Sequence, residues 1–436
     1  MQTGEVPRDW VDAHITPLHK KGPRSNCNNY RPVSLTSQVV KLLERIVLDN
    51  IKSLLQVNNT IIEDQHGFQS KSSCTTQLLE CLNDWTKDYD DAHQTDIIYL
   101  DFQKAFDSVP HQRLLRKLEQ HGIKGRVLSW ISSFLTDRRQ RVVLRNGVST
   151  WQQVTSGVPQ GTILGPILFL LYINDISENV SSHTKMFADD TKLYNTIHSI
   201  ADCEILQADL DKLSNWAKKW LLKFNVDKCV VLKTKTKHDY TYTLNGVSLQ
   251  EAAEQKDLGV TIANTLTPRN HIQNIVKKSN QRIGLIKRCF SYLSEKRVSI
   301  LYRTIVRPVL EYGCPVWSPW HLKDIYTLEK VQSRCLKLTK TDIKLQSLEQ
   351  RRRNYDLCEA YKYLHNLYKT PSNTYFTPVT RSLRGHSLKI QKQFARTDIR
   401  RNFFSNRVVS SWNELPDEIV TSRTLARFKR QLTSLA

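Results

Sequence analysis

Three aspartates are the residues of this 436-residue chain whose spacing suits a specific chemistry. Asp189 and Asp190 are adjacent in the tetrapeptide Phe187-Ala188-Asp189-Asp190, and Asp101 lies far upstream at the end of an apolar run. Adjacent carboxylates in a tight turn repel each other unless cations offset their charge. A third carboxylate beside them would complete a site for two hard divalent cations about 4 Å apart, which suits phosphoryl transfer. A lone Asp-Asp pair is also typical of a solvated turn, so its context is needed to choose.

Predicted strands could bring these acids together. Asp96–Phe102 is a run of β-branched and aromatic residues, which predicts a buried strand with Asp101 at its end. Met186–Tyr194 predicts a hairpin with Ala188-Asp189-Asp190 at its turn. The other predicted elements are two strands within Ala13–Leu35 joined by a basic loop, a hairpin of Gln140–Leu144 with Trp151–Thr155 closed around Asn146-Gly147, a strand at Val230–Lys233, and helices at Val39–Gln56, Thr75–Asp88, His111–Gln120, Gly125–Leu135 and Ala201–Leu222.

The composition narrows the class of protein. A formal charge of +22 and a pI of about 9.6 indicate either a polyanionic partner or a generally basic solvated surface, and charge alone does not separate RNA, DNA and anionic lipid. The nine cysteines are scattered and never form a Cys-x-x-Cys pair, which disfavours disulfides and zinc and favours reduced residues in an intracellular protein. The longest apolar run, Ile163–Ile173, contains Gly165 and Pro166 and falls short of the roughly 18 residues of a membrane span. We therefore expect no membrane segment and no secretory peptide.

The aspartates stand within a series of motifs in a fixed order. These motifs are Asn29-Tyr30-Arg31-Pro32-Val33-Ser34-Leu35, Gln65-His66-Gly67-Phe68, Leu100-Asp101-Phe102-Gln103-Lys104-Ala105-Phe106-Asp107, Ser156-Gly157-Val158-Pro159-Gln160-Gly161, Phe187-Ala188-Asp189-Asp190, Phe224-Asn225-Val226-Asp227-Lys228-Cys229 and Lys256-Asp257-Leu258-Gly259-Val260. The set resembles the reverse transcriptases of non-LTR retrotransposons, the LINE-type mobile elements. Arg307–Gly313 and Trp412–Pro416 resemble segments of animal elements, such as those of the jockey-like clade.

The resemblance implies a fold and an activity. It implies an α+β right-hand polymerase, with fingers and palm built from an antiparallel sheet and packed helices over residues 1–237. A primer grip and a helical thumb would follow over 238–340, and a basic helical C-terminal region over 341–436. The implied activity is that of an RNA-directed DNA polymerase, a nucleotidyltransferase that uses an RNA template, a DNA primer or nicked target DNA, and dNTPs.

The resemblance also assigns the catalytic residues. Asp101, Asp189, Asp190 and the carbonyl of Phe102 would ligate two Mg²⁺ ions, and hard oxygen donors would also accept Mn²⁺. Lys228 matches a lysine that is thought to protonate the departing pyrophosphate.

Other positions match residues that hold the nucleotide. Arg31, together with Lys20 or Lys21, matches finger residues that grip the triphosphate, since a guanidinium fork suits phosphate. Phe106 matches a steric gate, a ring that would collide with a ribose 2′-hydroxyl. The alternatives are solvated surface charge for the basic residues and ordinary core packing for Phe106.

Three further assignments concern the sugar and the nucleic-acid strands. Gln160 would contact the nucleotide sugar, and Gly161 would let the template backbone approach closely because it has no Cβ; the alternative for both is a plain turn. Leu258-Gly259-Val260 matches the primer-grip turn. The basic residues of the following helices could track an RNA–DNA hybrid or belong to a solvated helix face; they include Lys277, Lys278, Arg282, Lys287 and Arg288.

The chain also departs from the family pattern. Members normally carry an upstream endonuclease and a fingers extension, neither of which precedes the first motif, and no RNase H set or Cys-His knuckle is visible. We expect a 5′-truncated element copy that acts inside the cell, in the nucleus or cytoplasm, as part of a ribonucleoprotein. The competing interpretations are a catalytically inactive nucleic-acid-binding remnant and a maturase-like or telomerase-like enzyme.

Overall fold

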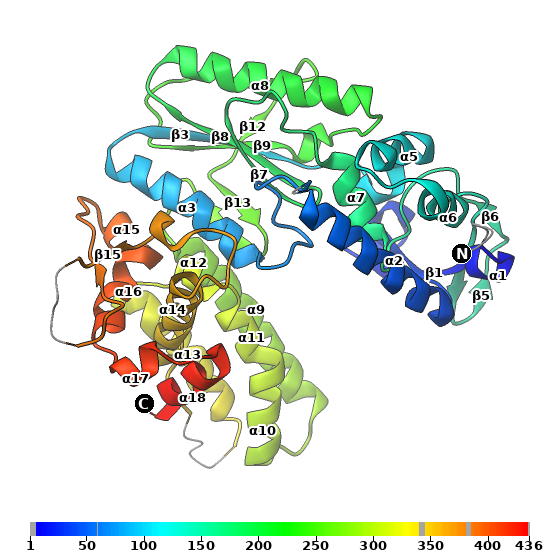
Figure 1. Cartoon of the computed structure of the whole chain (residues 1–436). Helices are drawn as coiled ribbons and strands as arrows, with labels where there is room; N and C mark the ends of the chain where they lie inside the picture. Colours follow the sequence, from blue (N-terminus) through cyan, green and yellow to red (C-terminus); the bar gives the residue numbers. More distant parts are fainter. Residues whose placement is uncertain (1–5, 59, 340–344, 381–384, 435–436) are drawn as a thin grey trace.

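The structure is a computed structural model that describes residues 6–58, 60–339, 345–380 and 385–434. Within these residues it is a mixed α/β fold with two five-stranded sheets, three two-stranded sheets and helices from the first half of the chain to the last (Figure 1). The mixed class that the sequence predicted is therefore confirmed.

A central sheet in the order β12-β9-β3-β8-β7 organises the first half of the chain. Its strands are β3 (Gln94–Leu100), β7 (His183–Phe187), β8 (Asp190–Ile197), β9 (Val230–Thr234) and β12 (Gln250–Glu251). Strand β3 pairs antiparallel with both β8 and β9, and all seven of its residues are buried. Its side chains alternate between two cores, with Ile98 and Leu100 in one and Ile97 and Tyr99 in the other. Helices therefore cover both faces, and the second half of the strand, Ile97–Leu100, is an unbroken run of buried hydrophobic residues.

The helices on the two faces follow the predicted pattern. Helix α8 (Ile200–Lys219) runs along one face of the sheet and α3 (Cys74–Asp90) along the other (Figure 1). Helix α3 begins at Ser73, which exchanges side-chain and backbone hydrogen bonds with Thr76 in a capping box. The remaining helices of this half are α1 (Arg8–Val11), α2 (Gln38–Val57), α4 (Ala105–Ser108), α5 (His111–Gln120), α6 (Gly125–Leu135) and α7 (Gly165–Ile173), with 3₁₀ turns at Cys27–Asn29 and Val226–Lys228.

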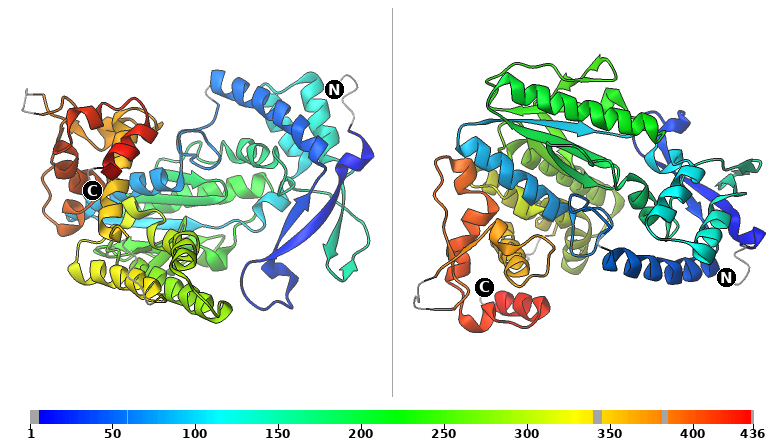
Figure 2. Two further views of the ribbon diagram at one scale, coloured as in Figure 1. Left: turned by 90° about the horizontal axis from the view of Figure 1, so that it is seen from below. Right: turned by 45° about the horizontal axis from the view of Figure 1, so that its top comes forward.

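A second sheet projects from this body (Figure 2). It contains β1 (Asp12–His19), β2 (Tyr30–Leu35), β4 (Arg139–Leu144), β5 (Gly147–Val148) and β6 (Gln152–Gln153). The antiparallel β1–β2 pair joined by a basic loop was predicted and is confirmed. The parallel pairing of β1 with β4, which ties segments more than a hundred residues apart, was not predicted.

Short hairpins and a helical bundle follow. The strands are β10 (Thr243–Leu244), β11 (Val247–Ser248), β13 (Glu254–Asp257) and β14 (Val260–Ala263), and the helices are α9 (Arg269–Cys289), α10 (Glu295–Leu301), α11 (Arg307–Glu311), α12 (Cys314–Trp317) and α13 (Leu322–Leu336). Between α10 and α11, Tyr302–Val306 forms a π-helical segment just before Pro308, which lacks the N–H that an α-helical register needs. None of the helices in the described ranges is long and apolar enough to cross a membrane.

The C-terminal region packs on the back of α3 (Figure 1). It comprises α14 (Leu348–Leu364), a 3₁₀ turn at Ser372–Thr374, β15 (Thr377–Pro378), β16 (Ile390–Gln391), α15 (Asp398–Arg401), α16 (Phe404–Asn413), α17 (Asp417–Val420) and α18 (Leu425–Ser434). Arg400 donates to Asn83 and Thr86, and the Thr397 amide and hydroxyl donate to Asp90.

The domain limits stay predictions. The limit at 340/341 lies outside the described residues. The limit at 237 falls before a segment that still packs on the central sheet, because β12 pairs with β9 and the Tyr242 hydroxyl donates to Asp96 at 2.7 Å.

Candidate active site

The two adjacent aspartates lie at the turn between β7 and β8. Phe187 pairs with Asp190, which leaves Ala188 and Asp189 as a two-residue turn. Ala188 adopts a left-handed conformation with φ of 56°. Asp101 follows directly on β3, whose last residue pairs with the β8 residue after Asp190. The fold thus brings the three predicted acids to the same end of two neighbouring strands.

The acids are crowded. Burial raises the pKa of Asp189, and the negative charge of Asp101 adds to the effect, while Arg31 and Lys20 oppose it. Asp190 is an exposed residue, yet the pKa of its carboxyl group is raised to about 6. The surrounding protein desolvates the carboxylate, and the negative charges of its acidic neighbours, led by Asp189, add to this effect. Clustered carboxylates whose pKa values are raised in this way are typical of a site for cations.

Asp101 has one cationic partner. The Lys228 ammonium lies 2.8 Å from the Asp101 carboxylate, and both side chains are at least one-third exposed. Exposed pairs of this kind contribute little stability, so a stronger cation can displace the lysine. With the side chains in this arrangement, no three His, Cys, Asp or Glu groups of the described residues form a metal cluster. The donor set itself fits a hard divalent cation, because it consists of carboxylates, and because burial and then neighbouring negative charge raise the pKa of both Asp189 and Asp190.

Two phenylalanines flank this site. The Phe102 ring is buried and stacks on Phe224 with ring centroids 4.3 Å apart, so the ring packs in the core and the predicted metal ligand is the backbone carbonyl. The Phe106 ring is partly buried and stacks on Phe169 of α7 at 4.4 Å. Packing therefore holds the Phe106 ring in a fixed orientation, which is also what a steric gate needs.

The predicted phosphate-gripping residues come from the β1–β2 hairpin. Arg31 is an exposed residue of β2. Burial raises the pKa of Asp189 and of Asp107, and the positive charges of Arg31 and Lys20 oppose this rise. Lys21 is exposed one residue further into the loop. Arg31 and Lys20 thus lie near enough to the acids for their charges to act there.

Gln160 and Gly161 connect this hairpin to the site. The side-chain amide nitrogen of Gln160 donates to the Asp107 carboxylate at 3.0 Å, and the backbone carbonyl of Gln160 accepts the Ser34 N–H at 2.7 Å. Gly161 has φ of 107°, and a Cβ there would lie 2.6 Å from the Ser34 carbonyl oxygen. In the structure, glycine is needed at 161 because strand β2 of the same chain approaches it.

The predicted primer-grip residues form a tight hairpin. Leu258 and Gly259 are the central residues of a two-residue turn, with φ of 43° and 91°, as a type I′ turn requires. The Tyr312 hydroxyl donates to the Leu258 carbonyl at 2.9 Å, and Val260 is fully buried. The hairpin is tied to strand β8 by Lys192 and Asp257, whose buried side chains form an ion pair at 2.7 Å.

The five basic residues singled out on α9 are all exposed: Lys277, Lys278, Arg282, Lys287 and Arg288. Their position on the solvent face of the helix agrees equally with contact to a nucleic-acid backbone and with simple solvation.

Sequence reasoning missed two features beside the acids. Gln65 was noted in a motif but given no role; its side-chain oxygen accepts the Ala188 N–H at 2.9 Å. The Lys192–Asp257 pair was missed as well, because β8 mixes polar and apolar residues and its sequence does not show that this lysine is buried.

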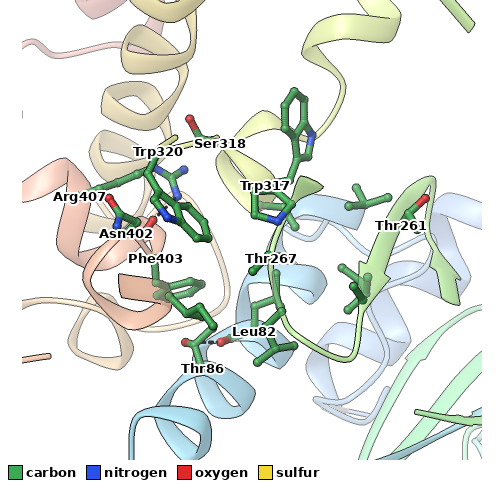
Figure 3. Close-up of a pocket in the computed structure, with 17 residues that line it drawn as sticks. Leu82, Thr86, Thr261, Thr267, Trp317, Ser318, Trp320, Asn402, Phe403 and Arg407 are labelled. Atoms are coloured by element: carbon green, nitrogen blue, oxygen red, sulfur yellow. Dashed lines mark hydrogen bonds between the residues drawn. The ribbon is translucent and has the colours of Figure 1, made fainter. Parts of the chain in front are cut away.

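A small cavity lies apart from the aspartates (Figure 3). It is enclosed by α3, β14, the end of α12 and the C-terminal region, and its labelled lining includes Trp317, Trp320 and Phe403. Its volume of about 40 Å³ holds a few water molecules and no nucleotide. The candidate site is therefore the open surface around the aspartates.

The family model and the curated relatives indicate one family. The family model described as "Reverse transcriptase (RNA-dependent DNA polymerase)" matches residues 18–262. The "Probable RNA-directed DNA polymerase from transposon BS" of Drosophila melanogaster is 28% identical over 348 residues, which cover 76% of this chain and 38% of that protein. The "RNA-directed DNA polymerase from mobile element jockey" of the same species is 29% identical over 353 residues, with the same two shares. The chain thus spans about 38% of the length of these relatives. Among solved structures, apo telomerase from Candida tropicalis aligns with a TM-score of 0.46 at 12% identity, covering 82% of this chain and 61% of that one.

Proposed function

Because the chain belongs to the reverse transcriptase (RNA-dependent DNA polymerase) family, we propose that it extends a DNA 3′-hydroxyl on an RNA template by nucleotidyl transfer. The observation that carries the proposal is the meeting of Asp101, Asp189 and Asp190 at the ends of two paired strands. The sequence resemblance to polymerases of non-LTR elements, with matches to the BS and jockey polymerases, supports an element-encoded enzyme.

The three carboxylates and the Phe102 carbonyl are the groups that would hold two Mg²⁺ ions, with Mn²⁺ as a substitute. When bound, such ions lower the pKa of the primer hydroxyl and neutralise the triphosphate. In the transfer, the primer O3′ loses its proton to solvent and forms a bond to the α-phosphorus, while the bond from that phosphorus to the bridging oxygen breaks and releases pyrophosphate.

The chain's own residues position the reactants. Arg31, Lys20 and Lys21 would bind the triphosphate, because their hairpin carries positive charge toward the aspartates. Lys228 would leave Asp101 and supply a proton to the departing pyrophosphate. Phe106 would exclude a 2′-hydroxyl from beneath the sugar.

The strands of the substrate would be held by further groups. Gln160 would contact the nucleotide sugar and Gly161 the template strand. Leu258-Gly259-Val260 would guide the primer end, and the exposed basic residues of α9 would follow the hybrid backbone.

We assign the parts of a right-hand polymerase accordingly. Residues 1–237 would form fingers and palm, 238–340 the primer grip and thumb, and 341–436 a basic helical region. The enzyme would act inside the cell, in the nucleus or cytoplasm, bound to its template as a ribonucleoprotein.

Primer extension tests the proposal directly. Purified protein is incubated with a DNA primer annealed to RNA, the four dNTPs and Mg²⁺, beside an unprimed RNA control. The expected result is extension to the template end that requires the primer and the divalent cation. Hybrid binding with a steep salt dependence but no extension would overturn the proposal and support a catalytically inactive nucleic-acid-binding remnant.

A further inference from the structure

We propose that Gln65 is a positioning residue that fixes the catalytic turn; the inference rests on the proposed function and assigns a task to the motif Gln65-His66-Gly67-Phe68. The Gln65 side-chain oxygen accepts two backbone N–H groups, that of Ala188 at 2.9 Å and that of Gly67 at 2.7 Å. Gln65 is 2% exposed, so water does not compete for this oxygen. One buried amide therefore joins the motif to the residue directly before Asp189.

The turn needs such support. The left-handed conformation of Ala188, with φ of 56°, is unfavourable for an L-residue, because its Cβ approaches the following carbonyl. A residue in that conformation persists only where its surroundings hold it there. The Gln65 oxygen supplies the hydrogen bond that fixes the Ala188 peptide and, through it, the backbone of Asp189.

The motif itself is fixed to strand β7. The Met186 amide donates to the Asp64 carbonyl and the His66 amide donates to the Met186 carbonyl, both at 2.9 Å, so that Gln65 and Met186 form a parallel bridge. A Cβ at position 67 would lie 2.4 Å from the Ala188 nitrogen. The backbone of Gly67 therefore lies directly against the backbone of Ala188, and Gln65 between them has little room to move.

A buried charge network anchors the motif from behind. The His66 ring lies 3.2 Å from the Glu80 carboxylate of α3, and Lys185 bridges Glu80 at 3.2 Å and Asp64 at 3.0 Å. Burial alone would raise the pKa of Glu80, but the His66 ring, the Lys185 charge and a hydrogen bond from Thr370 lower it to about 2. The carboxylate is therefore ionised at any working pH, and it ties the motif to the helix behind the sheet.

A purely structural role and a positioning role make different predictions. If Gln65 only satisfies buried polar groups, its loss lowers stability and leaves the kinetics of folded enzyme unchanged. If it positions the turn, its loss misplaces Asp189 by a fraction of an ångström. Such a displacement lowers kcat, by about 10²-fold for a shift near 1 Å, while dNTP binding through Arg31 keeps KM nearly constant.

The test compares Gln65→Leu with Gln65→Glu and a matched control. Gln65→Glu keeps an oxygen acceptor of the same reach. The control is Gln77→Leu, which removes another fully buried glutamine, one whose two amide atoms have no hydrogen-bond partner in the part of the chain that the structure describes. The readouts are hydrogen exchange of the peptide spanning Met186–Asp190, the thermal midpoint, and kcat and KM for dNTP.

We expect exchange at Ala188 to accelerate at least about 10-fold in Gln65→Leu, because its acceptor is lost. Gln65→Glu and Gln77→Leu should keep wild-type protection, and kcat should fall with KM unchanged in Gln65→Leu alone. Unchanged exchange in Gln65→Leu, or an equal loss of kcat in Gln77→Leu, would overturn the inference. Exchange needs no turnover, so absence of activity in the wild type would refute the proposed function while leaving this test intact.

Discussion

Breaking the ion pair between Lys192 and Asp257 should destabilise the protein far more than removing both partners. Lys192 lies on β8 two residues after Asp190, and Asp257 precedes the Leu258-Gly259 turn. Their charged atoms are 2.7 Å apart, and the side chains are only 2% and 3% exposed. Burial opposes the charged form of Lys192, but the Asp257 carboxylate overcomes this and raises the pKa of the lysine.

The size of the expected loss in unfolding free energy follows from the burial of the two side chains. In Lys192→Met the Asp257 carboxylate stays buried without its counter-ion, which should cost about 3–5 kcal/mol of unfolding free energy. The double variant Lys192→Met/Asp257→Leu replaces both charges by apolar groups of similar volume and should lie within about 1 kcal/mol of wild type or above it. The matched control is Arg401→Met, which breaks an ion pair with Asp398 whose side chains are more than half exposed, and it should cost at most about 1 kcal/mol.

Urea titration followed by tryptophan fluorescence measures these differences. The pair also connects the catalytic strand to the predicted primer grip, so Lys192→Met should lose primer extension at temperatures where the double variant retains it. A loss below about 1 kcal/mol in Lys192→Met, or equal losses in the single and double variants, would refute the reasoning about desolvation.

Three further predictions concern the site itself. Gly67→Ala places a Cβ 2.4 Å from the Ala188 nitrogen, so the turn must move by about 1 Å and kcat should fall about 10²-fold. The control Gly147→Ala should match wild type, because a Cβ there meets nothing within 4 Å. Equal activity of the two variants would contradict the close approach of Gly67 to Ala188. The rate of single-nucleotide incorporation should rise with pH through about 6, because only ionised Asp190 binds a cation. A higher Mg²⁺ concentration should move the midpoint of this pH profile to lower pH. A midpoint that does not depend on Mg²⁺ would argue against Asp190 as a metal ligand. Phe106→Ala should lower the ratio of kcat/KM for dNTP to that for rNTP by about 10-fold or more, since the ring no longer blocks a 2′-hydroxyl, and an unchanged ratio leaves Phe106 as a packing residue on Phe169.

The parts of the structure that local patterns determine were predicted well. The hairpin at Asp189, the strand before Asp101 and the helix limits at His111–Gln120 follow from residue periodicity and turn residues within short windows. Asp101 and the Asp189-Asp190 pair were therefore found together on paired strands, as expected.

The remaining features depend on contacts between distant segments. The parallel pairing of β1 with β4 and the bond from Gln65 to Ala188 each join residues more than a hundred positions apart, and no local pattern encodes such pairs. Gly161 is a further example. Its sequence context indicated that a backbone approaches it closely, but only the fold shows that strand β2 of the same chain does so.

The proposed role of the three aspartates as a cation-dependent catalytic centre requires that Asp189→Asn lose activity. The measurement is single-turnover incorporation of one dNTP at saturating Mg²⁺, with Asp227→Asn as control, because Asp227 is an exposed acid beside Lys228. We predict that Asp189→Asn lowers the rate by at least about 10²-fold, with a hybrid affinity like that of wild type, and that Asp227→Asn keeps the full rate. Incorporation by Asp189→Asn at the wild-type rate would contradict the account.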